Sequence, residues 1–373
     1  MTVIRNFPRV YFDFGAREAL AEELSACGIE RPRFITDPGV AACGVFDIVR
    51  KSVPETALIS VFDQTPENPT LDGVESALEV YRAGGCDGVV AVGGGSVIDS
   101  AKALATLVLN PAPLRQYSGP GAIPPAAGAA PIIAIPTTAG TGSEVTRGAG
   151  IHPNAESRAF SAGGDHVLPK VAICDPELTL TLPPMLTAGT GMDALGHCIE
   201  GFLSPVVNPP VDAIALDGIS RVVRHIERAV ADGSDREARW HMAMAALEGG
   251  MAISKGLESV HALANTFGDV GLHHGMLVTV SMPAVLRFLA PHVSAKTATL
   301  ARAMDLEEGA DVAKAVERLN DLVGLPANVR DLGYSKQDID EMAEDAAESF
   351  FNGTCPKVPS REEYAELIRD ALG

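Results

Sequence analysis

The sequence predicts two domains, an α/β domain over residues 1–182 followed by an all-helical domain over residues 183–373. Up to about residue 180, short β-branched runs alternate with segments of helical apolar spacing, a pattern typical of parallel β-α-β units. After Pro183 and Pro184 such runs become rare, and helical periodicity continues to the C-terminus. With 373 residues and a hydrophobic content of 46%, the chain is long and apolar enough for two globular domains.

In the first domain, strands and helices are expected to alternate in the order that a wound parallel sheet requires. Gly15 ends the first strand, and prolines and glycines leave residues 119–130 without a regular element. The expected strands are residues 10–14, 33–37, 57–62, 88–92 and 132–135, and the helices are 20–27, 40–53, 71–83 and one beginning near Val97.

In the second domain, the apolar spacing predicts helices joined by short turns, with no internal repeat. These helices are expected over residues 186–203, 208–231, 235–253, 258–267, 276–290, 295–303, 310–323, 336–347 and 360–371.

Two loops after buried strands of the first domain have the composition of a phosphate or nucleotide site. Residues 93–96 read Gly-Gly-Gly-Ser and open a helix, where glycines allow close backbone approach and free N–H groups attract a phosphate. Residues 136–144, Pro-Thr-Thr-Ala-Gly-Thr-Gly-Ser-Glu, supply hydroxyls at the carboxyl end of the next strand. The first loop is not the Gly-x-Gly-x-x-Gly fingerprint, and a ligand-free turn is the alternative.

A set of metal-type ligands is expected in the second domain. Asp193 and His197 are four residues apart at helical spacing, so they share one face of a helix. His261 and the adjacent pair His273 and His274 offer further imidazoles, of which only one of the pair is expected to face an ion. One carboxylate with two or three imidazoles suits Fe(II) or Zn rather than Ca or Mg. A hydrogen-bonded Asp–His pair without a metal is the alternative.

Charge and cysteine content exclude several classes of partner and compartment. A formal charge of −19 argues against nucleic acid and against an anionic membrane surface. Six cysteines without pairing rhythm indicate reduced thiols, which favours a cytoplasmic protein. The N-terminus lacks the apolar core of a signal peptide, and the uncharged stretch after Gln116 contains too many prolines for a membrane helix.

Taken together, these motifs resemble the iron-containing, or group III, alcohol dehydrogenase family. The resemblance covers nearly the whole chain and keeps the order of the motifs. It rests on Gly-Gly-Gly-Ser-x-x-Asp at 93–99, the Pro-Thr-Thr loop at 136–144, Asp-Pro-Glu at 175–177, Gly-Met-Asp-Ala-Leu-x-His-x-x-Glu at 191–200, and His-Gly at 274–275.

The resemblance implies an N-terminal dinucleotide-binding domain, a C-terminal metal-binding domain, and the architecture shared with dehydroquinate synthase. It implies NAD, with NADP as an alternative, and a divalent ion, iron first and zinc second. The implied ligands are Asp193, His197, His261 and His274. The implied cofactor residues are Gly94, Gly95 and Ser96 at the pyrophosphate, Asp99 close by, Thr137, Thr138 and Thr141 along the cofactor, and Asp37 at the adenosine ribose.

The expected activity is hydride transfer between NAD(H) and a small alcohol or aldehyde. A homo-oligomer is expected because relatives are often dimers or larger, and a dimer is favoured. Asp37 predicts NAD over NADP, since a carboxylate repels a 2′-phosphate; a helix cap is its alternative role. Glycerol-dehydrogenase-like polyol oxidation and a dehydroquinate-synthase-like lyase are the rival enzymes, and a non-catalytic metal-binding protein is the rival class.

The chain departs from the family pattern at two places. Relatives commonly carry a second histidine where this chain has Asn265, which cannot relay a proton near neutral pH, so aldehyde reduction is the expected direction. Residues 354–357 read Thr-Cys-Pro-Lys where relatives often have Asn-Pro-Arg, which predicts a different floor of the substrate pocket. Arg147 is a candidate for holding an anionic substrate group, with ordinary surface exposure as the alternative.

Overall fold

The computed structural model describes residues 4, 6–54, 57–118, 122, 124–154, 157–268, 272–335 and 338–373. The chain divides into two compact units. We call Asn6–Thr138 with Ser143–Thr181 the α/β unit, and Ala139–Gly142 with Leu182–Gly373 the helical unit. None of the described helices has both the length and the apolarity needed to cross a bilayer.

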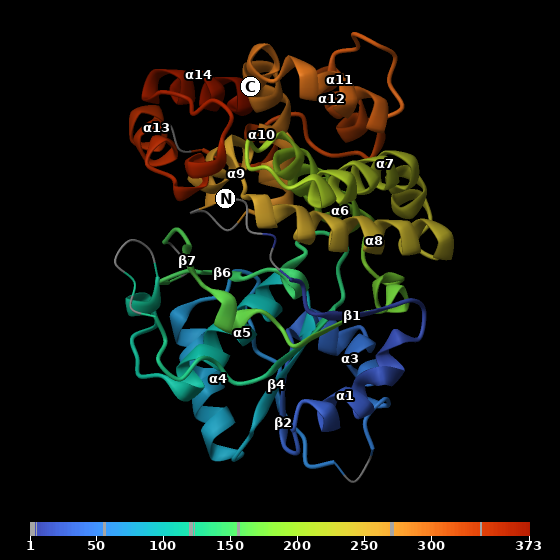
Figure 1. Ribbon diagram of the computed structural model, residues 1–373, viewed down its shortest axis with the longest axis vertical. Helices are drawn as coiled ribbons and strands as arrows, with labels where there is room; N and C mark the ends of the chain where they lie inside the picture. Colours follow the sequence, from blue (N-terminus) through green and yellow to red (C-terminus); the bar gives the residue numbers. More distant parts are fainter. Residues whose placement is uncertain are drawn as a thin grey trace. The chain divides into compact units, whose positions relative to one another are not determined.

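The α/β unit is built on a six-stranded parallel sheet in the order β1-β8-β5-β4-β2-β3. Figure 1 labels β1, β2 and β4 of this sheet. The two central strands, β4 and β5, are buried along their whole length, as expected when helices cover both faces of a parallel sheet. The strands are β1 (Arg9–Phe12), β2 (Pro32–Ile35), β3 (Ser60–Phe62), β4 (Gly88–Gly93), β5 (Ile132–Pro136) and β8 (Val171–Cys174).

Helices cover the sheet on both faces because successive strand residues point to opposite sides. Val90 and Val92 pack in the core with α1 (Leu20–Ala26) and α3 (Val45–Arg50). Their neighbour Ala91 belongs to the other core, with α4 (Leu71–Ala83) and α5 (Gly95–Leu109). The short helix α2 (Pro38–Ala42) follows β2, and an antiparallel pair that sequence analysis did not expect, β6 (Gly148–Ile151) with β7 (Phe160–Gly163), follows the Pro-Thr-Thr loop.

The helical unit is centred on α6 (Pro184–Leu203), which is buried over nearly its whole length. Glycines let other helices approach it closely: a Cβ at Gly201 would lie 2.7 Å from the carbonyl oxygen of Ala252, and one at Gly196 would lie 2.9 Å from Val278. Helices α7, α8 and α10 pack against α6. The further helices are α7 (Pro209–Ala231), α8 (Arg236–Ala252), α9 (Ser259–Thr266), α10 (His274–Leu289), α11 (Ser294–Ala303), α12 (Val312–Leu322), α13 (Ile339–Ala347) and α14 (Arg361–Leu372).

The fold class predicted from the sequence is confirmed, and the differences are local. The helix expected over residues 40–53 is two helices, because Gly44 adopts a φ of +80° that interrupts a right-handed helix. The strand expected over 57–62 is paired only from Ser60. The helix expected from residue 336 begins at Ile339, where Asp338 caps it; residues 336–337 lie outside the described residues, as do 119–121 and 123 of the irregular stretch.

Candidate metal and cofactor sites

Helix α6 places three acidic or imidazole side chains on one face. Asp193, His197 and Glu200 follow each other at intervals of four and three residues, so their side chains stack along the same side of the helix. All three are buried, with exposures of 2%, 4% and 1%. Buried ionisable groups are costly unless they are paired or hydrogen-bonded, so each of these side chains is expected to have a partner nearby.

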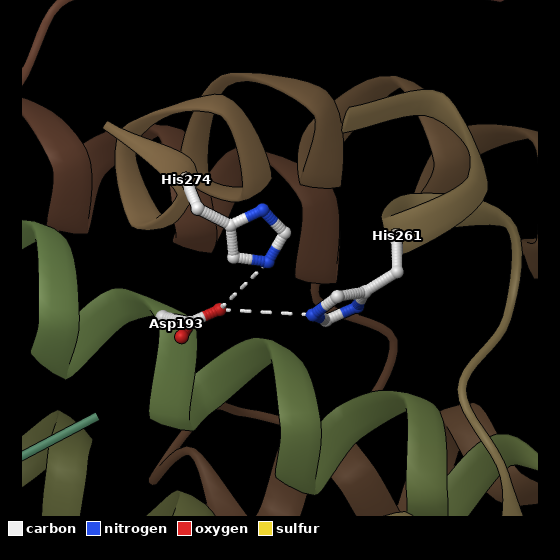
Figure 2. Close-up of side chains that lie close together, drawn as sticks. All are labelled: Asp193, His261 and His274. Carbon is white, nitrogen blue, oxygen red and sulfur yellow. Dashed lines mark ion pairs between the residues drawn. The ribbon is translucent and has the colours of Figure 1, made fainter. Parts of the chain in front are cut away.

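The imidazoles gather around one oxygen of Asp193. Its Oδ1 atom lies 3.6 Å from Nε2 of His197, 3.6 Å from Nε2 of His261 and 4.0 Å from Nε2 of His274. Figure 2 shows His261 and His274 approaching this carboxylate from α9 and α10. The ligand atoms of Asp193, His261 and His274 all lie within 4.8 Å of one another. His197 lies outside that mutual group but approaches the same oxygen from α6 itself.

Partners on the opposite ring nitrogens turn Nε2 of two histidines toward this point. Nδ1 of His261 is hydrogen-bonded to Oε2 of Glu200, and Nδ1 of His197 lies 3.3 Å from the carbonyl oxygen of Gly140. Such a hydrogen bond fixes the tautomer and orientation of a metal-binding imidazole and leaves the other nitrogen free to coordinate. Glu200 also accepts the backbone N–H groups of Glu258 and Val260, at 3.1 and 2.8 Å, so it anchors the start of α9 as well.

The neighbouring charges stabilise the protonated form of His261 and the ionised form of Asp193. Burial alone lowers the pKa of His261, but the neighbouring carboxylates of Glu200 and Asp193 outweigh it and raise the pKa to about 9. Burial raises the pKa of Asp193, but the surrounding imidazoles outweigh that effect and hold it below its usual range. Asp193 therefore keeps a full negative charge in a place that water hardly reaches.

The residues present fit a divalent cation. Oδ1 of Asp193 and Nε2 of His261 are buried atoms without a hydrogen-bond partner, although native proteins satisfy most such atoms. A tetrahedral ion with bonds of roughly 2.1 Å separates its ligand atoms by roughly 3.4 Å, close to the spacings around Asp193. One carboxylate and three imidazoles suit iron or zinc. The side chain of His274 is 44% exposed, so solvent and small molecules can reach the set there.

The two other residues discussed with these ligands, His273 and Asn265, belong to the same two helix regions. His273 is the N-cap residue of α10, and its ring is near Gly189, where an added Cβ would lie 3.6 Å from Nδ1. Asn265 lies on α9, one turn beyond His261. Of the two adjacent histidines, His274 is the one that the structure brings to Asp193.

In the α/β unit, the Gly-Gly-Gly-Ser turn and the first residues of the Pro-Thr-Thr loop lie side by side. They follow β4 and β5, which are neighbours in the sheet and pair Gly93 with Pro136. A Cβ at Gly94 would lie 3.2 Å from the methyl group of Thr138, and the N–H of Thr137 donates to the carbonyl of Gly93 at 3.1 Å. Helix α5 begins at Gly95 without a side-chain cap and without an acidic residue in its first turn. Such a helix start can receive a phosphate.

The other candidate cofactor residues have partners within the protein. Ser96 donates its hydroxyl to the carbonyl of Glu67. Asp99 accepts the hydroxyl of Ser143 and, at 2.8 Å, the N–H of Gly150. Thr141 lies in the helical unit, in the segment Ala139–Gly142 that also provides the carbonyl facing His197.

Asp37 is the N-cap residue of α2, and its Oδ1 accepts the N–H of Val40 at 2.9 Å. The structure therefore shows the capping role, which leaves the second oxygen of this half-buried carboxylate for other contacts. Arg147 forms an ion pair with Asp165 at 2.8 Å and is only 15% exposed in its side chain, so its guanidinium already has an anionic partner.

Sequence reasoning missed two residues as parts of these sites. Glu200 belongs to the recognised motif, and its spacing of seven residues from Asp193 already placed it on the ligand face of α6. Lys102 is completely buried in the α/β unit, and no sequence signal distinguishes it from an exposed helical lysine.

Comparison with known proteins places the chain in a family. Residues 8–176 match the model described as iron-containing alcohol dehydrogenase, and residues 187–372 match the C-terminal model of the Fe-containing alcohol dehydrogenase family. A 4-hydroxybutyrate dehydrogenase of Cupriavidus necator is 44% identical over 384 aligned positions, covering 100% of both chains. The chain belongs to the iron-containing alcohol dehydrogenase family.

Solved structures agree with this assignment. The crystal structure of a 1,3-propanediol oxidoreductase matches with a TM-score of 0.95 and 32% identity over 100% of both chains. A sulfoacetaldehyde reductase from Bifidobacterium kashiwanohense, solved with NAD+, matches with a TM-score of 0.91 and 26% identity over 100% of this chain and 99% of its own. The predicted family, fold class and enzyme class are thereby confirmed: the protein is an oxidoreductase of the NAD-dependent alcohol dehydrogenase type, acting on alcohols or aldehydes.

Proposed function

We propose that this enzyme reduces a small aldehyde with NADH at a divalent ion held by Asp193, His197, His261 and His274. The observation that carries the proposal is the convergence of three imidazoles on one buried carboxylate oxygen that has no hydrogen-bond partner. Iron is the favoured ion and zinc the second candidate, because both accept this mixture of nitrogen and oxygen ligands.

The protein's own groups would prepare the site for chemistry in distinct ways. The bound ion supplies Lewis-acid polarisation of a substrate oxygen, and the nicotinamide supplies the hydride. Glu200 holds the His261 ring in the tautomer that leaves Nε2 free, and the Asp193 carboxylate balances positive charge in a buried setting. The uncapped N-terminus of α5 would receive the pyrophosphate, with Gly94 allowing close approach beside Thr138.

For the substrate, we propose a short aliphatic chain with an anionic end, with succinic semialdehyde and 4-hydroxybutyrate as the leading pair. Support comes from the full-length match at 44% identity to a 4-hydroxybutyrate dehydrogenase. A reductase named for sulfoacetaldehyde, another small anionic aldehyde, shares the fold. Arg147 is not proposed to hold the anionic end, because Asp165 already pairs with it.

The proposed direction rests on Asn265. This amide stands one helical turn beyond His261 and cannot take up or release a proton near neutral pH. Alcohol oxidation must dispose of a proton, whereas aldehyde reduction needs one that water supplies readily. We therefore expect reduction to dominate near neutral pH and alcohol oxidation to grow under alkaline conditions.

The test is a set of steady-state rates in both directions from pH 6 to pH 10, with succinic semialdehyde and butanal as aldehydes and both NADH and NADPH. Reduction of succinic semialdehyde with NADH should have the highest kcat/KM. Asn265→His should raise alcohol oxidation at neutral pH while leaving metal content unchanged. Equal oxidation by the wild type at pH 7 and pH 9, with no gain in the variant, would remove Asn265 from the argument. Equal rates with both aldehydes would remove the anionic end from the proposed substrate.

Three further predictions about the protein accompany this proposal. We expect NAD to be preferred over NADP, a homo-oligomer with the dimer favoured, and a cytoplasmic location. Light scattering of the purified protein measures the oligomeric state directly.

A further inference from the structure

A completely buried lysine connects the start of α5 to the segment that follows the Pro-Thr-Thr loop. Lys102 has no exposed surface, and its Nζ lies 2.7 Å from the hydroxyl of Ser143, 3.0 Å from that of Thr146 and 2.7 Å from the carbonyl oxygen of Gly148. Asp99 is its ionic partner at 3.5 Å. All of these residues belong to the α/β unit.

The ammonium group is saturated by these contacts. It carries three protons, and three acceptors lie at 2.7–3.0 Å from it. With every donor used and no surface exposed, Lys102 cannot reach a cofactor phosphate. Any effect that it has on the cofactor must act through the segment that it holds.

Asp99 and Lys102, one turn apart on α5, both hold the segment 143–150. Asp99 accepts the hydroxyl of Ser143 on one oxygen and the N–H of Gly150 on the other, while Lys102 holds Thr146 and Gly148. Ser143 comes directly after the Thr-Gly part of the loop at 136–144, so this network determines where the loop ends. The same helix begins at the Gly-Gly-Ser turn that is the candidate phosphate site.

We propose that Lys102 is a positioning residue for the nicotinamide cofactor: it joins α5 to residues 143–148 and so holds the two cofactor loops at a fixed separation. Asp99 completes this network and acts on the loop, not on the pyrophosphate. The inference rests on the proposed binding of NAD at these loops. Removing the ammonium leaves Ser143, Thr146 and Gly148 without their shared donor, so residues 143–148 gain freedom that binding must then remove.

The decisive measurement is the dissociation constant of NADH, followed by fluorescence in the absence of substrate. Lys102→Met keeps the length of the side chain and should raise this constant about 10-fold or more, with unchanged metal content. In turnover, the KM for NADH should rise by a similar factor, while kcat at saturating NADH and the KM for the aldehyde stay close to wild type. A role limited to stability would lower Tm without this split.

Lys296→Met is the matched control. Lys296 also gives its ammonium to three acceptors, the carbonyl oxygens of Phe202, Leu203 and Ser204 at 2.8, 3.0 and 2.7 Å, but it does so in the helical unit. This variant should lower Tm and leave NADH binding unchanged. If Lys102→Met does not fold, Thr146→Val removes one acceptor only and should raise the dissociation constant about two- to fivefold.

The outcomes separate this inference from the proposed function. Wild-type protein that fails to bind NADH contradicts the proposed function itself. Wild-type binding together with a folded Lys102→Met protein of unchanged affinity overturns the positioning role alone, as does unchanged affinity in both Thr146→Val and Ser143→Ala. Equal weakening by Lys102→Met and Lys296→Met also overturns it, because a general loss of stability would then explain both.

Discussion

Both units bury ionisable side chains, but they treat them differently. In the helical unit, Oδ1 of Asp193 and Nε2 of His261 are buried without a hydrogen-bond partner. In the α/β unit, Lys102 is equally buried, yet three acceptors and a carboxylate surround its ammonium. A buried polar atom without a hydrogen-bond partner costs free energy, so it is retained where a bound ligand supplies the missing partner. A buried polar atom with all its hydrogen bonds stabilises the fold.

Among buried charged groups, unsatisfied polar atoms indicate a binding site, and fully hydrogen-bonded ones indicate a structural role. Each of His197 and His261 has one ring nitrogen hydrogen-bonded within the protein and turns the other toward Asp193. Lys102 keeps no donor in reserve. Changes in the first group should therefore act on a ligand, and changes in the second group on the conformation of the chain.

Removal of a ligand from the helical cluster should abolish metal binding. Asp193→Asn and His261→Ala each leave the shell incomplete, so metal content should fall to the background and the aldehyde reductase rate by more than about 1000-fold, beyond the 10- to 100-fold typical of partners that only orient a ligand. His273→Ala is the matched control and should keep its metal. Elemental analysis after dialysis measures the content; retention of metal in Asp193→Asn would disprove the site.

Loss of the carboxylate that orients His261 should weaken the site without abolishing it. Glu200→Gln should lower metal affinity about 10- to 100-fold, because the charge that supports the His261 ring disappears. Competition with a chelator measures the affinity. Glu248→Gln is the control: burial, with the neighbouring Asp217, raises the pKa of Glu248 to about 8, so this carboxyl is largely protonated at neutral pH and glutamine resembles it. Equal effects of both substitutions would contradict the assignment of Glu200.

In the α/β unit, a buried carboxyl should affect stability rather than metal binding. Burial raises the pKa of Glu144 to about 7 despite the opposing charge of Lys102, whereas an unfolded glutamate titrates near 4.5. Between these values the folded state holds a proton that the unfolded state has released, so stability present below pH 4.5 is lost as pH rises through 7, on the order of 3 kcal/mol.

Glu144→Gln should remove this dependence. The free energy of unfolding of Glu144→Gln minus that of the wild type, both measured in urea, should increase from pH 5 to pH 8. Metal content should be unchanged. A parallel pH dependence of the two proteins would show that Glu144 ionises normally.

The smallest effect is expected at Asp37, where cap and cofactor roles can be separated. Asp37→Ala should cost about 1 kcal/mol of stability through loss of the cap on α2. Asp37→Ser retains a capping oxygen but no charge, so it should restore most of the stability while lowering the preference for NADH over NADPH. The two kcat/KM values measure that preference; an unchanged ratio in the serine variant would leave Asp37 as a cap only.

Local sequence pattern by itself determined the fold class and the positions of most helices and strands. Strand and helix positions follow from periods of two and 3.6 residues, which depend on neighbours in the chain, so α4 begins and ends at the residues expected. The Gly-Gly-Gly-Ser turn and the Pro-Thr-Thr loop were each expected to follow a buried strand of the first domain, and they follow β4 and β5. The spacing of Asp193 and His197 likewise placed both on one helix face.

Tertiary structure alone decided which partners these groups have. Glu200 and His261 are 61 residues apart, and Lys102 and Ser143 are 41 apart, so no period along the chain relates them. The choice of His274 over His273 rested on family resemblance, and in the structure it is seen in the distance of 4.0 Å between Nε2 of His274 and Oδ1 of Asp193. Burial is likewise not visible in the sequence of α5, where Asp99 and Lys102 look like an ordinary helical ion pair. Only in the folded protein do residues 143–150 enclose the pair, so that it can hold that segment. Burial and long-range contact depend on how distant segments pack, which a local pattern does not encode.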